Sequence, residues 1–167
     1  QAAGAKRFAE RLRFKIDQDY AAWSKDRIRI WGDPSGSVQS QTDETTVYQI
    51  MRPEGIFAKP CYTNNLEVRI EAVQQTLKRL EDGRAGFLID ETGAPTTAMG
   101  LKGYYQYRRL ETTEERYATD PEKNRWSHPS EALAYVMVSE GEGRRVVRGD
   151  NPRPVKARQL TRKSGVF

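Results

Sequence analysis

Apolar residues recur every three or four positions in three stretches of the chain, which is the spacing of a helix with one buried face. These stretches are residues 4–24, Asn64 or Asn65 to about Glu81, and Ser127 or Pro129 to about Val138. Asparagine is a favoured residue just before a helix, and Gly83 follows the second stretch as a helix-ending residue. The pattern therefore predicts three amphipathic helices.

Shorter segments with alternating or continuous apolar residues predict strands between these helices. They are residues 27–32, 55–60, 85–90 and 102–109. Residues 44–52 fit a short helix or a strand equally well, because their periodicity does not distinguish the two. Turn-forming residues at 33–37, DPSGS, end the first predicted strand. Strands interspersed with helices predict an α/β fold with a mixed sheet.

Three acidic residues lie at the ends of these predicted elements. Asp33 follows the first strand, Asp90 ends the apolar run 85–90, and Glu131 lies in the first turn of the last helix. Side chains at strand ends in an open sheet face the crevice where ligands bind, and a neighbouring helix can bring a third acid to it. Each acid alone is better explained as a turn, strand-end or helix-start residue, and only the three together favour a site.

Carboxylates that come together repel one another unless a cation joins them, and hard oxygen ligands select Mg²⁺ or Mn²⁺. Two such ions about 4 Å apart can activate a water and stabilise the leaving oxygen of a phosphodiester. The three acids together therefore predict a metal-dependent nuclease.

The composition excludes other kinds of site. The 167 residues include one cysteine, Cys61, and one histidine, His128. These counts exclude an intramolecular disulfide and a metal site built from cysteines or from several histidines. No stretch approaches the roughly 20 apolar residues of a membrane-spanning helix, and the charged, amphipathic start predicts no signal peptide.

Positive charge is concentrated at the end of the chain. The formal net charge is +5, and residues 139–167 contain eight basic and three acidic residues, so this segment holds the whole excess. Residues 141–167 also contain several glycines and prolines and little apolar periodicity. They predict a basic, partly extended arm that binds nucleic acid, or alternatively a solvated linker.

A second basic segment lies at residues 104–109, YYQYRR. In a strand, these residues either face DNA, with the arginines on phosphates, or form a half-buried edge with solvated arginines. Residues 123–125, KNR, likewise either contact the DNA backbone or form a polar loop.

The order of several short motifs resembles the nuclease domain of phage large terminase subunits. The similar motifs lie within about residues 27–138, at 31–36, 43–46, 64–65, 69–73, 86–90, 103–107, 121–124 and 127–135. The resemblance depends on their order and combination, because no single motif is highly specific. It implies an RNase H-like fold, with a central mixed β-sheet flanked by helices.

The resemblance also implies a function and a set of site residues. The family cuts concatemeric double-stranded viral DNA during genome packaging with divalent metal, so we expect two Mg²⁺ or Mn²⁺ ions. Asp33 matches its first acid and Asp90 its second. The third acid lies at the start of a C-terminal helix, where this chain offers both Glu131 and His128. Asp43 and Glu44 either support the site or cap a nearby element.

Intact members of the family also contain an ATPase motor and work with a portal and a small terminase subunit in the host cell cytoplasm. The phosphate loop of that motor is missing here, since no glycine in this chain is followed by lysine. We therefore interpret residues 1–26 as a connecting helix, 27–140 as the nuclease domain and 141–167 as the basic arm.

Two other functions remain open from the sequence. The same fold is compatible with a ribonuclease H or a junction resolvase. A non-cleaving DNA-binding or docking module of the packaging motor would keep the basic segments and lack the metal site. Whether the acids converge in space separates a nuclease from a docking module, and sequence spacing does not show it.

Overall fold

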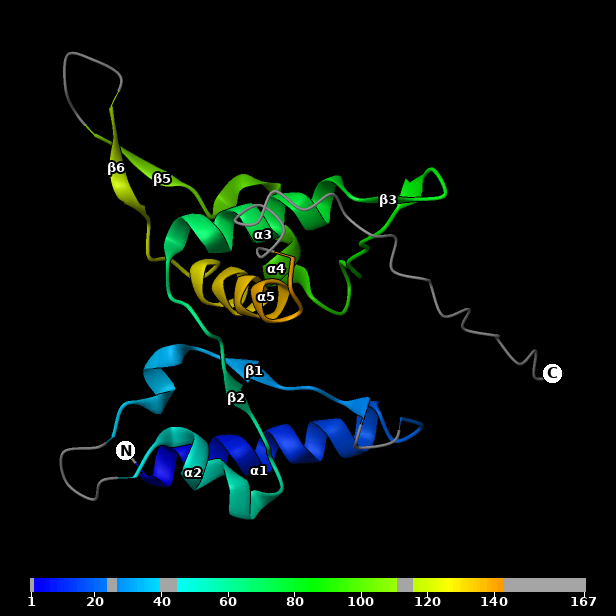
Figure 1. Ribbon diagram of the computed structural model, residues 1–167, viewed down its shortest axis with the longest axis vertical. Helices are drawn as coiled ribbons and strands as arrows, with labels where there is room; N and C mark the ends of the chain where they lie inside the picture. The colour runs from blue at the N-terminus through cyan, green and yellow to red at the C-terminus, as the bar shows by residue number, and fades with distance from the viewer. Residues whose placement is uncertain (1, 24–26, 40–44, 111–115, 143–167) are drawn as a thin grey trace, which may run out of the picture.

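The computed structural model describes residues 2–23, 27–39, 45–110 and 116–142. Figure 1 shows two units, one formed by α1, α2, β1 and β2, the other by three helices and two hairpins. The first unit contains α1 (Ala2–Asp19), β1 (Trp31–Gly32), α2 (Val47–Met51) and β2 (Lys59–Pro60). The second contains α3 (Leu66–Lys78), β3 (Leu80–Glu81), β4 (Arg84–Ala85), α4 (Pro95–Met99), β5 (Tyr107–Leu110), β6 (Arg116–Pro121) and α5 (Ser127–Ser139).

The core of the first unit forms where α1 packs on α2. Its buried residues are Ala9, Tyr48, Met51, Ile56 and Ala58, with Leu12, Ile16 and Ile30 packed against them. Of the apolar stripe predicted for residues 4–24, only Leu12 and Ile16 pack against this core, whereas Phe8, Tyr20 and Trp23 are exposed. The helix itself is confirmed, but it ends at Asp19. Residues 44–52, which the pattern left open, contain the short helix α2.

Strands β1 and β2 are parallel and short. Trp31 is opposite Lys59 and Gly32 is opposite Pro60. The amide of Lys59 donates to Ile30 O (3.0 Å) and that of Cys61 donates to Gly32 O (2.8 Å). The predicted strands at 27–32 and 55–60 are confirmed only at these ends.

In the second unit, α5 crosses α3 and the two helices share a small core of Cys61, Ala72, Tyr135 and Val138. The predicted cap of α3 is confirmed, because Asn65 Oδ1 accepts from the amide of Val68 (3.1 Å). The helix ends at Lys78 rather than near Glu81. Gly83 (φ 76°) instead turns the β3–β4 hairpin together with Asp82 (φ 51°), as a tight hairpin requires.

The buried strand predicted at residues 85–90 is wrong. Only Ala85 belongs to a strand, residues 87–90 have no regular structure, and Leu88 is 84% exposed. A short apolar run forms a buried strand only where neighbouring strands pair with it, and β3–β4 pairs with no third strand among the described residues. The predicted strand at 102–109 is wrong in its first half, since Gly100–Tyr104 forms a π-helical turn before β5.

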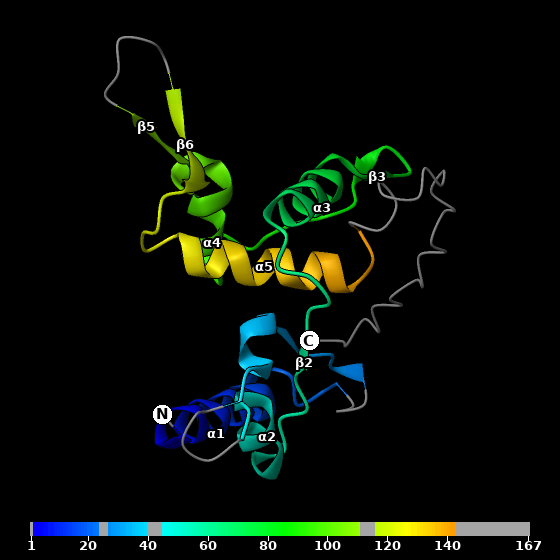
Figure 2. The same ribbon diagram turned by 60° about the vertical axis from the view of Figure 1, so that its left-hand side comes forward.

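Within the described residues, the strands form three separate two-stranded sheets, one parallel and two antiparallel. Figure 2 shows the β5–β6 hairpin projecting from the helices and α5 facing the first unit. The central mixed sheet of an RNase H-like fold stays a prediction. Within the same residues, no helix combines the length and the apolar character needed to cross a membrane.

The two units meet where β1 approaches the end of α5. Trp31 Nε1 donates to Glu140 Oε1 (2.8 Å), and Arg29 pairs with the other oxygen of the same carboxylate (2.6 Å). This junction sets the position of the residues that follow β1 relative to α5.

Replacing Gly100 with alanine is expected to destabilise the second unit. A Cβ at this buried position would lie 2.2 Å from Ser130 Oγ, and Ser130 is itself buried on α5. Because the backbone φ of −55° suits any residue, the cost is steric and should be about 1–3 kcal/mol. Urea unfolding measures it, with Gly4→Ala as the control, since nothing lies within 4 Å of that Cβ. Equal stability of the two variants would contradict this packing.

Candidate active site

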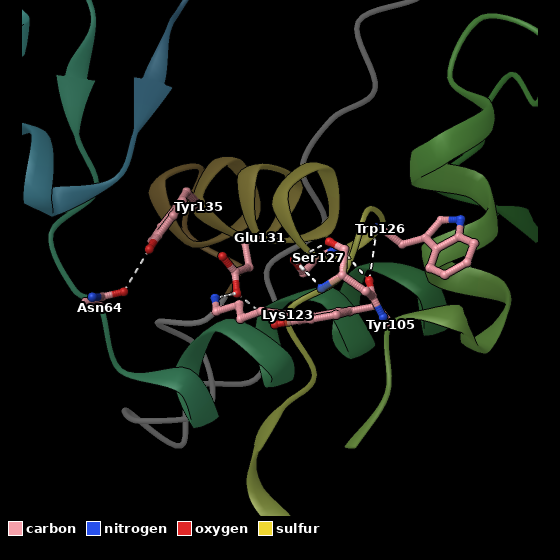
Figure 3. Close-up of polar contacts among 8 residues, drawn as sticks. Asn64, Tyr105, Lys123, Trp126, Ser127, Glu131 and Tyr135 are labelled. Atoms are coloured by element: carbon pink, nitrogen blue, oxygen red, sulfur yellow. Dashed lines mark hydrogen bonds and ion pairs between the residues drawn. The ribbon is translucent and has the colours of Figure 1, made fainter. Parts of the chain in front are cut away.

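Residues on one face of α5 form the centre of the candidate site. Glu131 and Tyr135 lie one helical turn apart, and Tyr135 is buried against α3. The Tyr135 hydroxyl donates to Asn64 Oδ1 (2.7 Å), just before α3 begins. Figure 3 shows Tyr135 pointing toward Asn64, and Glu131 between Lys123 and Tyr105.

Arg69 lies next to this face, in the first half of α3. Its guanidinium carbon is 4.9 Å from the centroid of the Tyr135 ring, within the range of a cation–π interaction. The residue is only 9% exposed, which places a positive charge in the packed layer between α3 and α5.

Asp33 approaches the same cluster from the first unit. It follows β1 directly, as predicted, and its Oδ1 accepts from the amide of Ser35 (2.8 Å) at the start of the 3₁₀ turn Pro34–Ser37. Tyr48 packs under this turn and donates to the carbonyl of Asp33 (2.6 Å). Cβ atoms at Gly32 or Gly36 would lie 2.6 or 2.9 Å from Tyr48, so both glycines are needed for this packing.

The surroundings of Asp33 favour its charged form. Partial burial raises the pKa of its carboxyl, but hydrogen bonds from the amide and side chain of Ser35, the polar influence of the Tyr135 hydroxyl and the charge of Arg69 together outweigh it. The pKa of Asp33 is therefore lowered. Burial raises the pKa of Tyr135 to about 12, with Arg69 opposing and Asp33 and Glu131 adding to the shift. At neutral pH Asp33 is thus ionised and Tyr135 is protonated.

Glu131 has two partners in the cluster. Its Oε1 accepts from the Tyr105 hydroxyl (3.0 Å) and forms an ion pair with Lys123, and the Glu131 side chain is 14% exposed. Burial and then the hydrogen bond to Glu131 raise the pKa of Tyr105. Glu131 is the fifth residue of α5 and not in its first turn, because the helix begins at Ser127, whose amide donates to Asn124 Oδ1 (3.2 Å).

The structure does not bring all the predicted residues to this cluster. Asp90 is exposed, and its Oδ1 accepts from the amide of Thr92 (2.9 Å) in the turn before α4. His128 is exposed at the second position of α5. Among the described residues, no three histidine, cysteine or acidic side chains are grouped so that they could hold a metal ion. Asp33 and Glu131 are the two predicted acids whose charges both act on Tyr135.

Asp43 and Glu44 lie outside the described residues, as do residues 143–167 of the predicted basic arm. In the basic segment 104–109, Tyr104 ends the π-helical turn and β5 begins at Tyr107, and Arg108 and Arg109 are exposed.

The reasoning from sequence did not single out Arg69 or Tyr135 as site residues. A signal for Arg69 exists, since it shares the buried face of α3 with Ala72 and Thr76 at helical spacing. A charge on the buried face of a helix needs a nearby partner or an aromatic ring. The apolar spacing instead predicts a buried face of Leu66, Ile70, Val73, Leu77 and Leu80, and all five are only partly buried or exposed, with Leu80 in β3.

Ionised Asp33 stabilises the folded protein, because its pKa is lower there than the ordinary value of 3.8. This stabilisation is present above the ordinary pKa and is lost as the pH falls through the lowered pKa. We expect Tyr135→Phe to raise the pKa of Asp33 toward 3.8, as followed by carboxyl-carbon NMR titration. Tyr20→Phe, at an exposed position directly after α1, serves as the control. An unchanged pKa of Asp33 in Tyr135→Phe would show that the hydroxyl does not act on it.

Comparison of the chain with protein-family models, curated proteins and solved structures gives no match.

Proposed function

We propose that this chain is a metal-dependent endonuclease that cuts double-stranded DNA, of the kind found in phage large terminase subunits. The main support is that Asp33 and Glu131, from different units, both act on Tyr135, whose ring lies against the buried Arg69. Acids that are distant in sequence and come together beside a buried cation are typical of a functional site.

The donor set fits a hard divalent cation. Mg²⁺ is commonly bound by one or two carboxylates and completes its coordination with waters and substrate phosphates. Asp33 and Glu131 would be those carboxylates, and Asp33 is both exposed and ionised at neutral pH. When bound, the ion supplies Lewis acidity and an activated water for phosphodiester hydrolysis. Asp90 would join it only by a movement of its loop.

The protein's own residues prepare the acids for this role. Ser35, Tyr135 and Arg69 keep Asp33 ionised. Tyr105 and Lys123 fix the carboxylate of Glu131 on α5. The protonated Tyr135 connects α5 to Asn64 and so keeps the cluster together.

Double-stranded DNA is the proposed substrate. Arg108 and Arg109 are exposed on the hairpin that projects from the helices (Figure 1), and Lys123 and Arg125 lie exposed before α5. Such side chains contact phosphates without reading sequence, so binding should weaken steeply with salt. In an intact packaging protein, this domain would act in the host cell cytoplasm with an ATPase motor, a portal and a small terminase subunit.

Incubation with supercoiled plasmid tests the proposal. The chain should nick the plasmid with Mn²⁺ and leave it intact with EDTA. Parallel reactions on RNA–DNA hybrids and on branched DNA separate it from a ribonuclease H or a junction resolvase. The absence of Mn²⁺-dependent nicking, with DNA binding retained, would favour the other candidate described next.

A non-cleaving DNA-binding or docking module of a packaging motor is the second candidate. The position of Asp90 outside the cluster and the pairing of Glu131 with Lys123 support it, because both reduce the negative charge available to a metal. Such a module would bind DNA equally well after Asp33→Asn.

A further inference from the structure

The guanidinium of Arg69 has unused hydrogen-bonding capacity. An arginine has five N–H donors, and a buried donor without a partner is costly. Arg69 Nε is buried without a hydrogen-bond partner, and no described residue forms a hydrogen bond or a close ion pair with the terminal nitrogens. Arg79, which is partly exposed and also has an unpartnered Nε, differs at its terminal nitrogens, because they donate to Gly86 O (3.2 Å) and pair with Glu142.

Packing nevertheless fixes the guanidinium in place. The Tyr135 ring lies 4.9 Å from it, and Tyr135 is itself held by Asn64. The charges of Asp33 and Glu131 both act on this tyrosine, and the charge of Arg69 acts on Asp33, but neither carboxylate forms a hydrogen bond with the arginine's donors. The result is an oriented cation whose donors are not satisfied by the protein.

We propose that Arg69 binds a phosphate of the DNA backbone beside Asp33 and Glu131, through two parallel N–H···O bonds. The planar guanidinium matches two phosphate oxygens, and its buried position and the ring behind it reduce the ordering needed on binding. This inference rests on the proposed function, because Arg69 would align the phosphate of the DNA with the two acids that carry out the cleavage.

A binding titration with a short duplex in EDTA, where no cleavage occurs, tests this role. Arg69→Gln should weaken binding about tenfold, and Arg69→Lys should weaken it nearly as much, because lysine lacks the planar pair of donors. Arg69→Gln should also reduce the slope of log K against log salt by about 1. Arg52→Gln, at an exposed arginine of the first unit, is the matched control and should change neither quantity.

In the same titration, Asp33→Asn should change the affinity for DNA in the opposite direction to the Arg69 variants. Removing a negative charge next to the bound phosphate should strengthen binding in EDTA. If Arg69 serves only to neutralise Asp33, then Arg69→Lys will bind DNA as the wild type does, and that result overturns the proposal. Unchanged affinity in Arg69→Gln would also overturn it.

A measurement on the unaltered protein covers the case in which the variants do not fold. The Nε–Hε resonance of Arg69 should shift on titration with inorganic phosphate, and a resonance that does not move contradicts the site. These results are independent of nicking. If the wild type binds DNA through Arg69 but does not cut it, the proposed nuclease activity is wrong and the phosphate site stands. If the wild type cuts DNA and substitutions at Arg69 do not change its binding, the phosphate site is wrong and the nuclease activity stands.

Discussion

Replacing Asp33 with asparagine should reduce Mn²⁺-dependent nicking of plasmid DNA about a thousandfold, because several kcal/mol of metal-assisted stabilisation depend on its charge. The fold should be preserved. Asparagine can accept the hydrogen bond from Ser35 that the carboxylate now accepts, and it is equally favoured at the start of a helical turn. Initial rates of nicking, with circular dichroism as a check of folding, measure the effect.

Asp90→Asn is the matched comparison for this substitution. Asp90 also accepts a backbone hydrogen bond two residues ahead and is also exposed, but it does not interact with Arg69, Tyr135 or Glu131. We therefore expect Asp90→Asn to retain most of the activity. An equal loss in both variants would mean that Asp90 joins the site on DNA binding, as the resemblance to terminases implies.

Replacing Glu131 with glutamine should reduce nicking about a hundredfold, because the amide cannot neutralise a bound cation. Glu122→Gln removes the same charge from an exposed position nearby and should leave the rate unchanged. Full activity of Glu131→Gln would remove this residue from the catalytic set.

The same variant has a second readout that does not depend on activity. The hydrogen bond and the charge of Glu131 both raise the pKa of Tyr105, although burial contributes most. Glu131→Gln should therefore lower the pKa of Tyr105 part of the way toward 10. An ultraviolet titration of tyrosine ionisation follows the change, and an unchanged titration would contradict the observed contact.

Helices were the best-predicted part of the fold. The existence of α1, the asparagine before α3 and the start of α5 at Ser127 all follow from local preferences, and the structure confirms them. The buried face of α3 was predicted wrongly. Hydropathy favours Leu77 as the buried residue, but Arg69 and Thr76 are more buried than Leu77. Which face a helix buries depends on its tertiary partners, here Tyr135 and Val138 of α5.

Strands were harder to predict, because a strand exists only with a partner. Residues 85–90 have the apolar run of a buried strand, yet Leu88 lies exposed. The presence or absence of a partner strand also distinguishes Asp33 from Asp90. Asp33 follows a paired strand and reaches the cluster, whereas Asp90 follows an unpaired segment and bonds only within its own turn.

Only some residues of the candidate site could be predicted from the sequence. Asp33 and Glu131 could be proposed because their positions at element ends follow from local patterns. Tyr135 and Asn64 could not, since their hydrogen bond joins residues that are 71 positions apart. Only the packing of α5 across α3 brings them together.

The central claim is that Asp33 and Glu131 hold one divalent cation between them. Anomalous diffraction from crystals soaked in Mn²⁺ tests this most directly. We expect a manganese peak that contacts an oxygen of each carboxylate in the wild type and disappears in Asp33→Asn. A peak bound elsewhere, or crystals that bind no manganese at Asp33, would contradict it.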